Sequence, residues 1–96
     1  MPAVVYAPDA IRDFDRLVDF LADQDGAAAL ASAEVLTEGI KLLERHPLIG
    51  RPAESGLREL VISRGQTGYI ALYDYLEIID TVVVLAIRHQ REEGFD

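Results

Sequence analysis

The chain has 96 residues, of which 50% are hydrophobic and 27% charged, and it contains no cysteine. This composition is too apolar for a disordered chain, and without cysteine there are no disulfides and no thiolate metal sites. The net charge of −8 opposes non-specific binding to nucleic acid, so contact with DNA or RNA needs a basic partner or a local basic patch.

The length favours a single domain covering residues 1–96. No segment approaches the roughly 20 apolar residues that a transmembrane helix needs, and the N-terminus has no basic stretch followed by an apolar core. The lack of cysteine suits a reducing compartment. We therefore expect a cytoplasmic protein that does not bind membranes.

The first half of the chain predicts a short strand and two helices. Residues 3–6, AVVY, are β-prone. From Pro8 onward apolar residues recur at helical spacing until a break at Gly26. A second helical stripe follows and ends before Pro47, because a residue that precedes proline disfavours helical geometry. Small residues at the start of this stripe favour an antiparallel helical hairpin.

The second half predicts three strands. After a loop rich in Pro and Gly, in which we expect Arg51 to bind carbonyls at the helix ends, the apolar period changes to two. The strands cover residues 57–63, 69–78 and 80–89, and their turns are too short for helical crossovers. The sequence therefore predicts an α+β fold of order β-α-α-β-β-β, with an N-terminal strand, a helical hairpin and a three-stranded antiparallel meander.

The middle strand of this meander carries tyrosines on one face. Tyr69, Tyr73 and Tyr75 alternate with Ile70 and Leu72. Two helices can cover only one sheet face, and we expect them to cover the isoleucine and leucine. The tyrosine face would then be open to a partner, since tyrosine suits an interface. The alternative is that the tyrosines complete the core with their hydroxyls in water.

The last strand is apolar on both faces, as a central strand is. Strict alternation puts Val82, Val84 and Ala86 on one face and Val83, Leu85 and Ile87 on the other.

A cationic cluster follows that last strand. Arg88, His89 and Arg91 close it, and Arg58 begins the first strand of the meander. His89 could act as a general acid or base near neutral pH. The same residues could instead bind a partner, or be solvated and paired with nearby glutamates. His46 and His89 are far apart in sequence, and no phosphate-binding or triad motif is present, so we expect no metal and no cofactor.

Four segments, in order along the chain, carry a family resemblance: LLERHPLIGRP, LRELVIS, GYIALYDY and VVVLAIRHQREEGF. They resemble segments of the RelE/ParE toxins of type II toxin–antitoxin modules, and in particular the ParE-like, plasmid-stabilisation type. In that family they correspond to the helix end with its Gly-Arg-Pro loop, to two successive strands, and to the closing strand with its His-x-Arg tip. The resemblance implies a toxin that inhibits growth and is neutralised by a cognate antitoxin in a hetero-oligomer. It implies contact with DNA only through the antitoxin.

The resemblance also implies a choice of mechanism. RelE-like members cut messenger RNA on the ribosome with basic sheet residues, whereas ParE-like members lack those residues and, where characterised, poison DNA gyrase. Here Ile70 stands where the nuclease pattern has an arginine, Asp74 where many relatives are basic, and Phe95 near a terminal tyrosine. The resemblance therefore favours a toxin that binds a target such as gyrase and is not itself an enzyme.

Two alternatives remain open at this point. One is a RelE-like ribonuclease with a reduced site made of Arg58, His89 and Arg91. The other is a non-toxic interaction module of the same fold. In each case we expect partner contacts to come from three sets of residues. They are Asp13, Asp15, Asp19 and Asp23 of the first helix, Tyr69, Tyr73 and Tyr75 of the sheet, and the cations Arg58, Arg88, His89 and Arg91.

Overall fold

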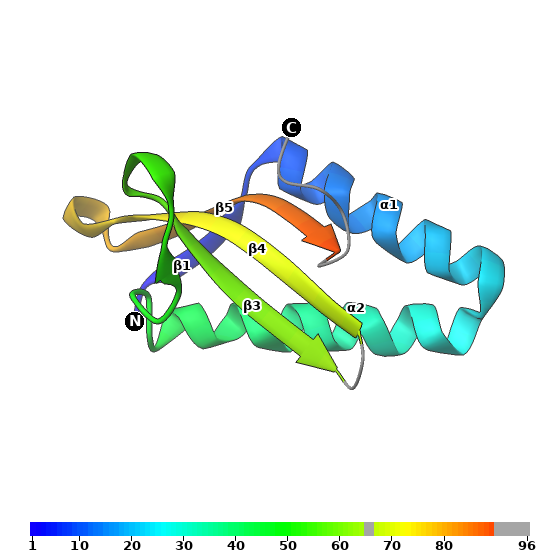
Figure 1. The fold of residues 1–96 in the computed structure, drawn as a ribbon. Helices are drawn as coiled ribbons and strands as arrows, with labels where there is room; N and C mark the ends of the chain where they lie inside the picture. The colour runs from blue at the N-terminus through cyan, green and yellow to red at the C-terminus, as the bar shows by residue number, and fades with distance from the viewer. Residues whose placement is uncertain (65–66, 90–96) are drawn as a thin grey trace.

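Within residues 1–64 and 67–89, which the structure describes, the chain folds into a five-stranded sheet with two long helices on one of its faces (Figure 1). The structure is a computed structural model. The helices and strands are β1 (Ala3–Tyr6), α1 (Pro8–Gln24), α2 (Gly26–Lys41), β2 (Arg51–Pro52), β3 (Arg58–Arg64), β4 (Thr67–Leu76) and β5 (Thr81–His89). The predicted α+β class and element order are confirmed, and β2 is an addition to them.

The helical hairpin forms from local signals. Pro8 lies in the first turn of α1, where its missing N–H costs nothing. Asp25 alone separates the helices and caps α2, because its carboxylate accepts hydrogen bonds from the backbone N–H groups of Ala27 and Ala28. In the described part of the chain, neither helix is long and apolar enough to cross a membrane.

The strands lie in the order β1-β5-β4-β3-β2. The β3–β4 and β4–β5 pairs are antiparallel, as predicted for the meander. The N-terminal strand β1 pairs with β5 in parallel, so the sheet as a whole is mixed. The chain passes through both helices between β1 and the meander. No tight turn therefore forces β1 to run antiparallel to its neighbour.

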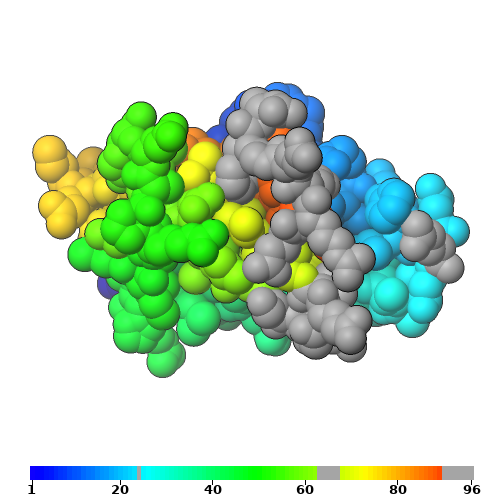
Figure 2. Space-filling view, in the orientation of Figure 1, coloured from blue at the N-terminus to red at the C-terminus, as the bar shows by residue number. Residues whose placement is uncertain are grey.

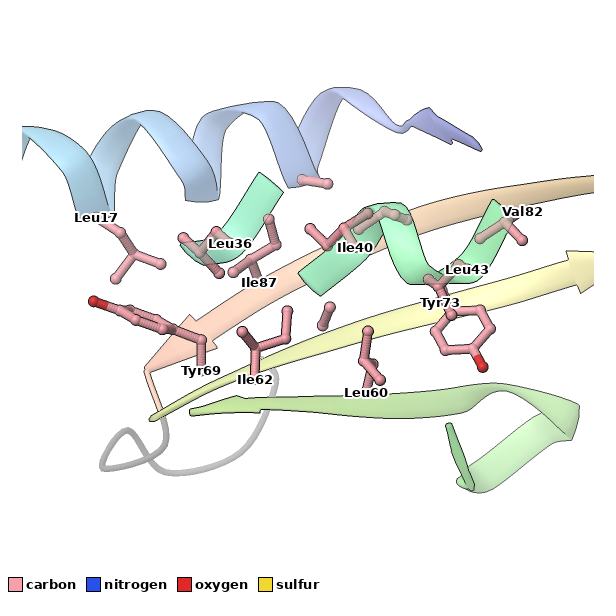
Figure 3. Close-up of a cluster of buried hydrophobic side chains, with 13 residues drawn as sticks. Leu17, Leu36, Ile40, Leu43, Leu60, Ile62, Tyr69, Tyr73, Val82 and Ile87 are labelled. Atoms are coloured by element: carbon pink, nitrogen blue, oxygen red, sulfur yellow. The ribbon is translucent and has the colours of Figure 1, made fainter. Parts of the chain in front are cut away.

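The expected covering of the sheet is also wrong: the helices cover the tyrosine face. Tyr69 and Tyr73 are 1% and 0% exposed, whereas Ile70 and Leu72 are only partly buried. Figure 3 shows both tyrosines in the layer between the helices and the sheet. The other large members of this core are Leu17, Leu36, Ile40, Leu43, Leu60, Ile62, Val82, Val84 and Ile87.

Close packing explains this choice of face. Gly39 of α2 lies directly on Ile62, since a Cβ at position 39 would lie 2.9 Å from Ile62 Cγ1. Ala71 leaves room in the centre of β4, and the large rings of Tyr69 and Tyr73 fill the layer on either side of it. Aromatic rings bury more apolar area than isoleucine or leucine, so the inward arrangement gains more hydrophobic stabilisation.

A β-bulge alters the faces of β5. The register pairs Leu72 with Ala86 but Tyr73 with Val84, so Leu85 is an extra residue in β5. The buried set is consequently Val82, Val84 and Ile87, all 0% exposed. Strict alternation put Ile87 on the opposite face from the two valines, and the bulge corrects that assignment.

Candidate functional site

Tyr73 and Arg58 hold the loop that follows α2. The Tyr73 hydroxyl accepts a hydrogen bond from the Gly50 N–H at 2.9 Å and donates one to the Pro47 carbonyl at 2.8 Å. The Arg58 guanidinium donates to the carbonyls of Gly50 at 2.8 Å and Leu48 at 3.3 Å. Both side chains, proposed as partner contacts from the sequence, therefore act within the fold.

Arg58, rather than Arg51, binds the carbonyls of this loop. Arg51 instead pairs with Glu59 across the β2–β3 ladder, with Nε 3.2 Å from Oε1. Burial raises the pKa of the Tyr73 hydroxyl, and the Gly50 hydrogen bond and the charge of Arg58 oppose this rise to a smaller extent. Only the neutral hydroxyl can donate the hydrogen bond to the Pro47 carbonyl, and a raised pKa favours that form.

Asp13 of α1 closes the end of β5. Its Oδ2 accepts a hydrogen bond from the Ile87 backbone N–H at 3.0 Å, and its Oδ1 lies 3.2 Å from Nη1 of Arg88. The ladder with β1 ends at Val84, so Asp13 takes the place of a strand neighbour for Ile87. The Asp13 side chain is only 15% exposed, which removes it from the set of aspartates open to a partner.

His89 lies against Tyr69 on the helix-facing side of the sheet. The two rings meet edge to face, with centroids 5.4 Å apart. No residue that the structure describes forms a hydrogen bond with the buried Tyr69 hydroxyl. The sequence placed both residues at a partner surface, but Tyr69 is in the core.

The sheet face turned away from the helices is apolar at its centre. Val61, Ile70 and Arg88 lie side by side across β3, β4 and β5, and Leu72 follows on the same face. Val61 is exposed, and Ile70 and Leu72 are partly so. A phosphate needs cations or hydrogen-bond donors, which the aliphatic side chains cannot supply, and the guanidinium of Arg88 on this face is paired with the carboxylate of Asp13.

The three candidates for a nuclease do not form one site in the described structure. Arg58 pairs with Tyr73 and His89 with Tyr69, so they lie four residues apart along β4, or about 13 Å at the usual strand rise. They also belong to strands on opposite sides of β4. Arg91 lies outside the described residues. Within the described residues, no group of acidic and histidine side chains could hold a metal ion.

Two features of the helical hairpin are open to solvent. Asp15, Asp19 and Asp23 are exposed and recur every four residues along one side of α1. We call them the acidic stripe. A shallow groove lined by Tyr6, Ile11, Phe14 and Thr37 runs between β1, α1 and α2, and we call it the hairpin groove. Burial raises the pKa of the Tyr6 hydroxyl at its edge.

The exposed end of the β4–β5 hairpin was not predicted from the sequence. β4 ends at Leu76, and Glu77–Ile79 forms a 3-10 turn that the sequence assigned in part to the strand. Tyr75, expected at a partner surface, lines a groove there and donates a hydrogen bond from its hydroxyl to Asp80 Oδ1 at 2.6 Å. This hydrogen bond raises the pKa of the Tyr75 hydroxyl. The available signal was a pair of isoleucines just before Asp80, at a point where the chain turns into the next strand.

The helical hairpin on one face of a sheet, between an N-terminal strand and an antiparallel meander, matches the RelE/ParE-like α+β fold. The model of the family described as the ParE toxin of type II toxin–antitoxin system, parDE, matches residues 4–94. The chain belongs to this family of toxins.

Relatives and solved structures agree with this assignment. Toxin RelE3 of Caulobacter vibrioides is 32% identical over 92 residues, which cover 96% of this chain and 98% of the relative. The chromosomal ParDE system from P. aeruginosa shares the fold with a TM-score of 0.77, at 24% identity, over 93% of this chain and 96% of that one. The toxin–antitoxin complex RelBE2 from Mycobacterium tuberculosis gives a TM-score of 0.59 at 26% identity, over 95% and 93%.

Proposed function

We propose that this toxin is ParE-like, that it inhibits growth by binding a cytoplasmic protein, and that this protein is DNA gyrase. The observation that carries the proposal is the arrangement of the described cations. Arg58 is bonded to loop carbonyls, Arg88 to Asp13, and His89 lies far from Arg58 along the sheet. Ile70, at the centre of the outer face, cannot stabilise a phosphate.

The net charge supports the same proposal. A ribosome-directed nuclease approaches a polyanion, and a chain with a net charge of −8 is repelled by it. A protein target with basic surfaces attracts such a chain. The alternative of a RelE-like ribonuclease draws its support from the 32% identity to a relative named RelE3.

We further propose that a cognate antitoxin neutralises this chain in a hetero-oligomer, as the toxin–antitoxin complexes of its structural neighbours suggest. The hairpin groove offers apolar surface, and the acidic stripe lies on the same helix. A segment that fits both carries apolar side chains on one side and Lys or Arg on the other.

The first prediction separates the two mechanisms. Expression of the chain alone is expected to stop growth, and co-expression of the product of the adjacent reading frame is expected to restore it. The purified chain is expected to inhibit supercoiling by gyrase, and to leave messenger RNA intact on programmed ribosomes, since Arg58 and His89, the candidates within the described residues, do not form one site.

Three results would contradict this prediction in different ways. Cuts within the ribosomal A-site codon that disappear in His89→Ala would establish the ribonuclease instead. Growth arrest with neither cleavage nor gyrase inhibition would refute gyrase as the target but keep the toxin. Normal growth at a verified high soluble level would favour a non-toxic interaction module.

The second prediction concerns the antitoxin. A variant with Asp15→Lys, Asp19→Lys and Asp23→Lys is expected to bind the antitoxin at least tenfold more weakly at low salt, because three attractions become repulsions. The difference from wild type is expected to shrink as salt rises. Asp13 is left unchanged because it holds β5.

The matched control reverses acids elsewhere on the surface. Glu34 and Glu38 are exposed on α2 with the same four-residue spacing, and Glu34→Lys with Glu38→Lys is expected to change the affinity less than threefold. The affinities can be measured by calorimetry at two salt concentrations. An equal loss of antitoxin affinity in both variants would mean that the acidic stripe acts only through the net charge of the chain.

A further inference from the structure

The end of the β4–β5 hairpin exposes a cluster of aliphatic side chains. Ile78 is fully exposed, at 101% of its reference area, and Ile79 is 63% exposed. Together with Leu76 of the hairpin and Leu48 of the facing loop they form the apolar tip, which lines one groove. Figure 2 shows the hairpin end projecting from the body of the molecule, at the far left of the view.

Hydrogen bonds hold this projection in one conformation. The Asp80 N–H donates to the Glu77 carbonyl at 3.1 Å, and the Tyr75 hydroxyl binds the Asp80 carboxylate. The Ala3 N–H donates to the Asp80 carbonyl at 3.1 Å, which ties the turn to β1. The Thr81 hydroxyl donates to the Ile79 carbonyl at 2.9 Å. Asp80 has φ 48° and ψ 52°, a left-handed conformation that a short polar side chain tolerates best.

The exposed isoleucines contribute little to the fold, because Ile78 is fully exposed and Ile79 is mostly so. A side chain as exposed as Ile78 removes no apolar area from water, so hydrophobic burial cannot account for it. Turn positions favour Gly, Asn, Asp and Ser, whose side chains are compatible with water. A rigid apolar projection loses little conformational entropy on binding, which is the property of a recognition element.

We propose that the apolar tip is the surface through which this toxin contacts its target protein, and that the target offers an apolar pocket with a basic rim. This inference rests on the proposed function and names the contact surface that the function requires. Ile78 and Ile79 would enter the pocket. Glu77 and Asp80, both exposed beside them, would face the basic rim. Arg58 also lines the groove, but its guanidinium is directed to the carbonyls of Leu48 and Gly50.

Charge and position argue against two other occupants. In a symmetric contact between two copies, Glu77 and Asp80 of one tip would face those of the other, and like charges repel. The antitoxin, in our proposal, binds the hairpin groove and the acidic stripe, and no residue of either lines the groove at the tip. Figure 1 shows the α1–α2 turn, toward which the acidic stripe runs, at the opposite end of the molecule from the β4–β5 end. Two separate surfaces match the two protein partners that a neutralised toxin needs.

The third prediction tests this surface. Ile78→Ser with Ile79→Ser is expected to weaken target binding about tenfold or more, as truncation of a central apolar anchor does, and so to abolish growth inhibition. Affinity for the purified product of the adjacent reading frame is expected to stay within threefold of wild type. Glu77→Lys is expected to reduce growth inhibition as well, because it would place a cation against the basic rim.

Leu30→Ser is the matched control, since Leu30 is 65% exposed on α2 near the other end of the molecule. It is expected to leave growth inhibition unchanged. Thermal unfolding verifies that each variant is folded, and soluble levels are matched in the growth assay. Full growth inhibition by the double variant would overturn the inference.

An equal loss of antitoxin affinity in the double variant would also overturn the inference, because it would assign the tip to the antitoxin. Failure of the wild-type chain itself to inhibit growth would refute the proposed function before any variant is compared, and this inference with it.

Discussion

Gly50→Ala is expected to lower the free energy of unfolding by about 2–5 kcal/mol, a large part of the stability of a domain of this size. A Cβ at position 50 would lie 2.6 Å from the Tyr73 hydroxyl oxygen and 2.9 Å from the Glu59 carbonyl oxygen. Tyr73 is fully buried and cannot swing aside. Either the loop moves and loses its hydrogen bonds to Tyr73 and Arg58, or the core is strained.

The matched control is Gly26→Ala. A Cβ at position 26, at the start of α2, has no atom within 4 Å. This variant is expected to be as stable as wild type or to gain up to about 1 kcal/mol, because alanine is the better helix former. Urea unfolding followed by circular dichroism measures both. A Gly50→Ala variant as stable as wild type would mean that the loop adapts, and that Tyr73 and Arg58 do not fix its position.

Asp13→Ala is expected to lower the free energy of unfolding by about 2–4 kcal/mol. The change removes the acceptor for the Ile87 N–H and for Arg88, and the two charged side chains are only 15% and 19% exposed. A partly buried N–H and a partly buried guanidinium would each lose this carboxylate. Asp13→Asn keeps an acceptor oxygen and is expected to lose less.

Asp15→Ala is the control for this change, since Asp15 is exposed on the same helix. It is expected to alter stability by no more than about 0.5 kcal/mol. Urea unfolding of the three variants with wild type gives the comparison. Equal small effects for Asp13→Ala and Asp15→Ala would show that Asp13 is a surface charge, and it would then return to the set of candidate antitoxin contacts.

The order of the elements could be predicted from the sequence, because each helix or strand is indicated by residues close together in the chain. Pro8 and the apolar stripe that follows it predict α1, and the change of period after the Gly-Arg-Pro loop predicts the meander. The resemblance to the RelE/ParE toxins rested on four short segments in order, and the family match over residues 4–94 confirms it. The sequence also indicated that nuclease residues are largely missing, because Ile70 stands where the nuclease pattern has an arginine.

The roles of individual site residues were much less readable. Arg58 was proposed as a cation for a partner, and it binds loop carbonyls eight and ten residues away. Asp13 was proposed as a surface charge, and it binds a strand 74 residues away. A charged residue has the same sequence signature in both roles, because its partner is chosen by the tertiary contacts and not by its neighbours in the chain.

By itself, the sequence determined the class, the elements and the family of this toxin, since hydrophobic periodicity and turn residues act over a few positions. Only the tertiary structure decided which sheet face is covered. Both faces of β4 are apolar, so a period of two cannot distinguish them, and packing of the tyrosines against the helical hairpin made the choice. The bulge at Leu85, the parallel pairing of β1 and the rigid display of Ile78 likewise arise from contacts between distant segments, which no local pattern encodes.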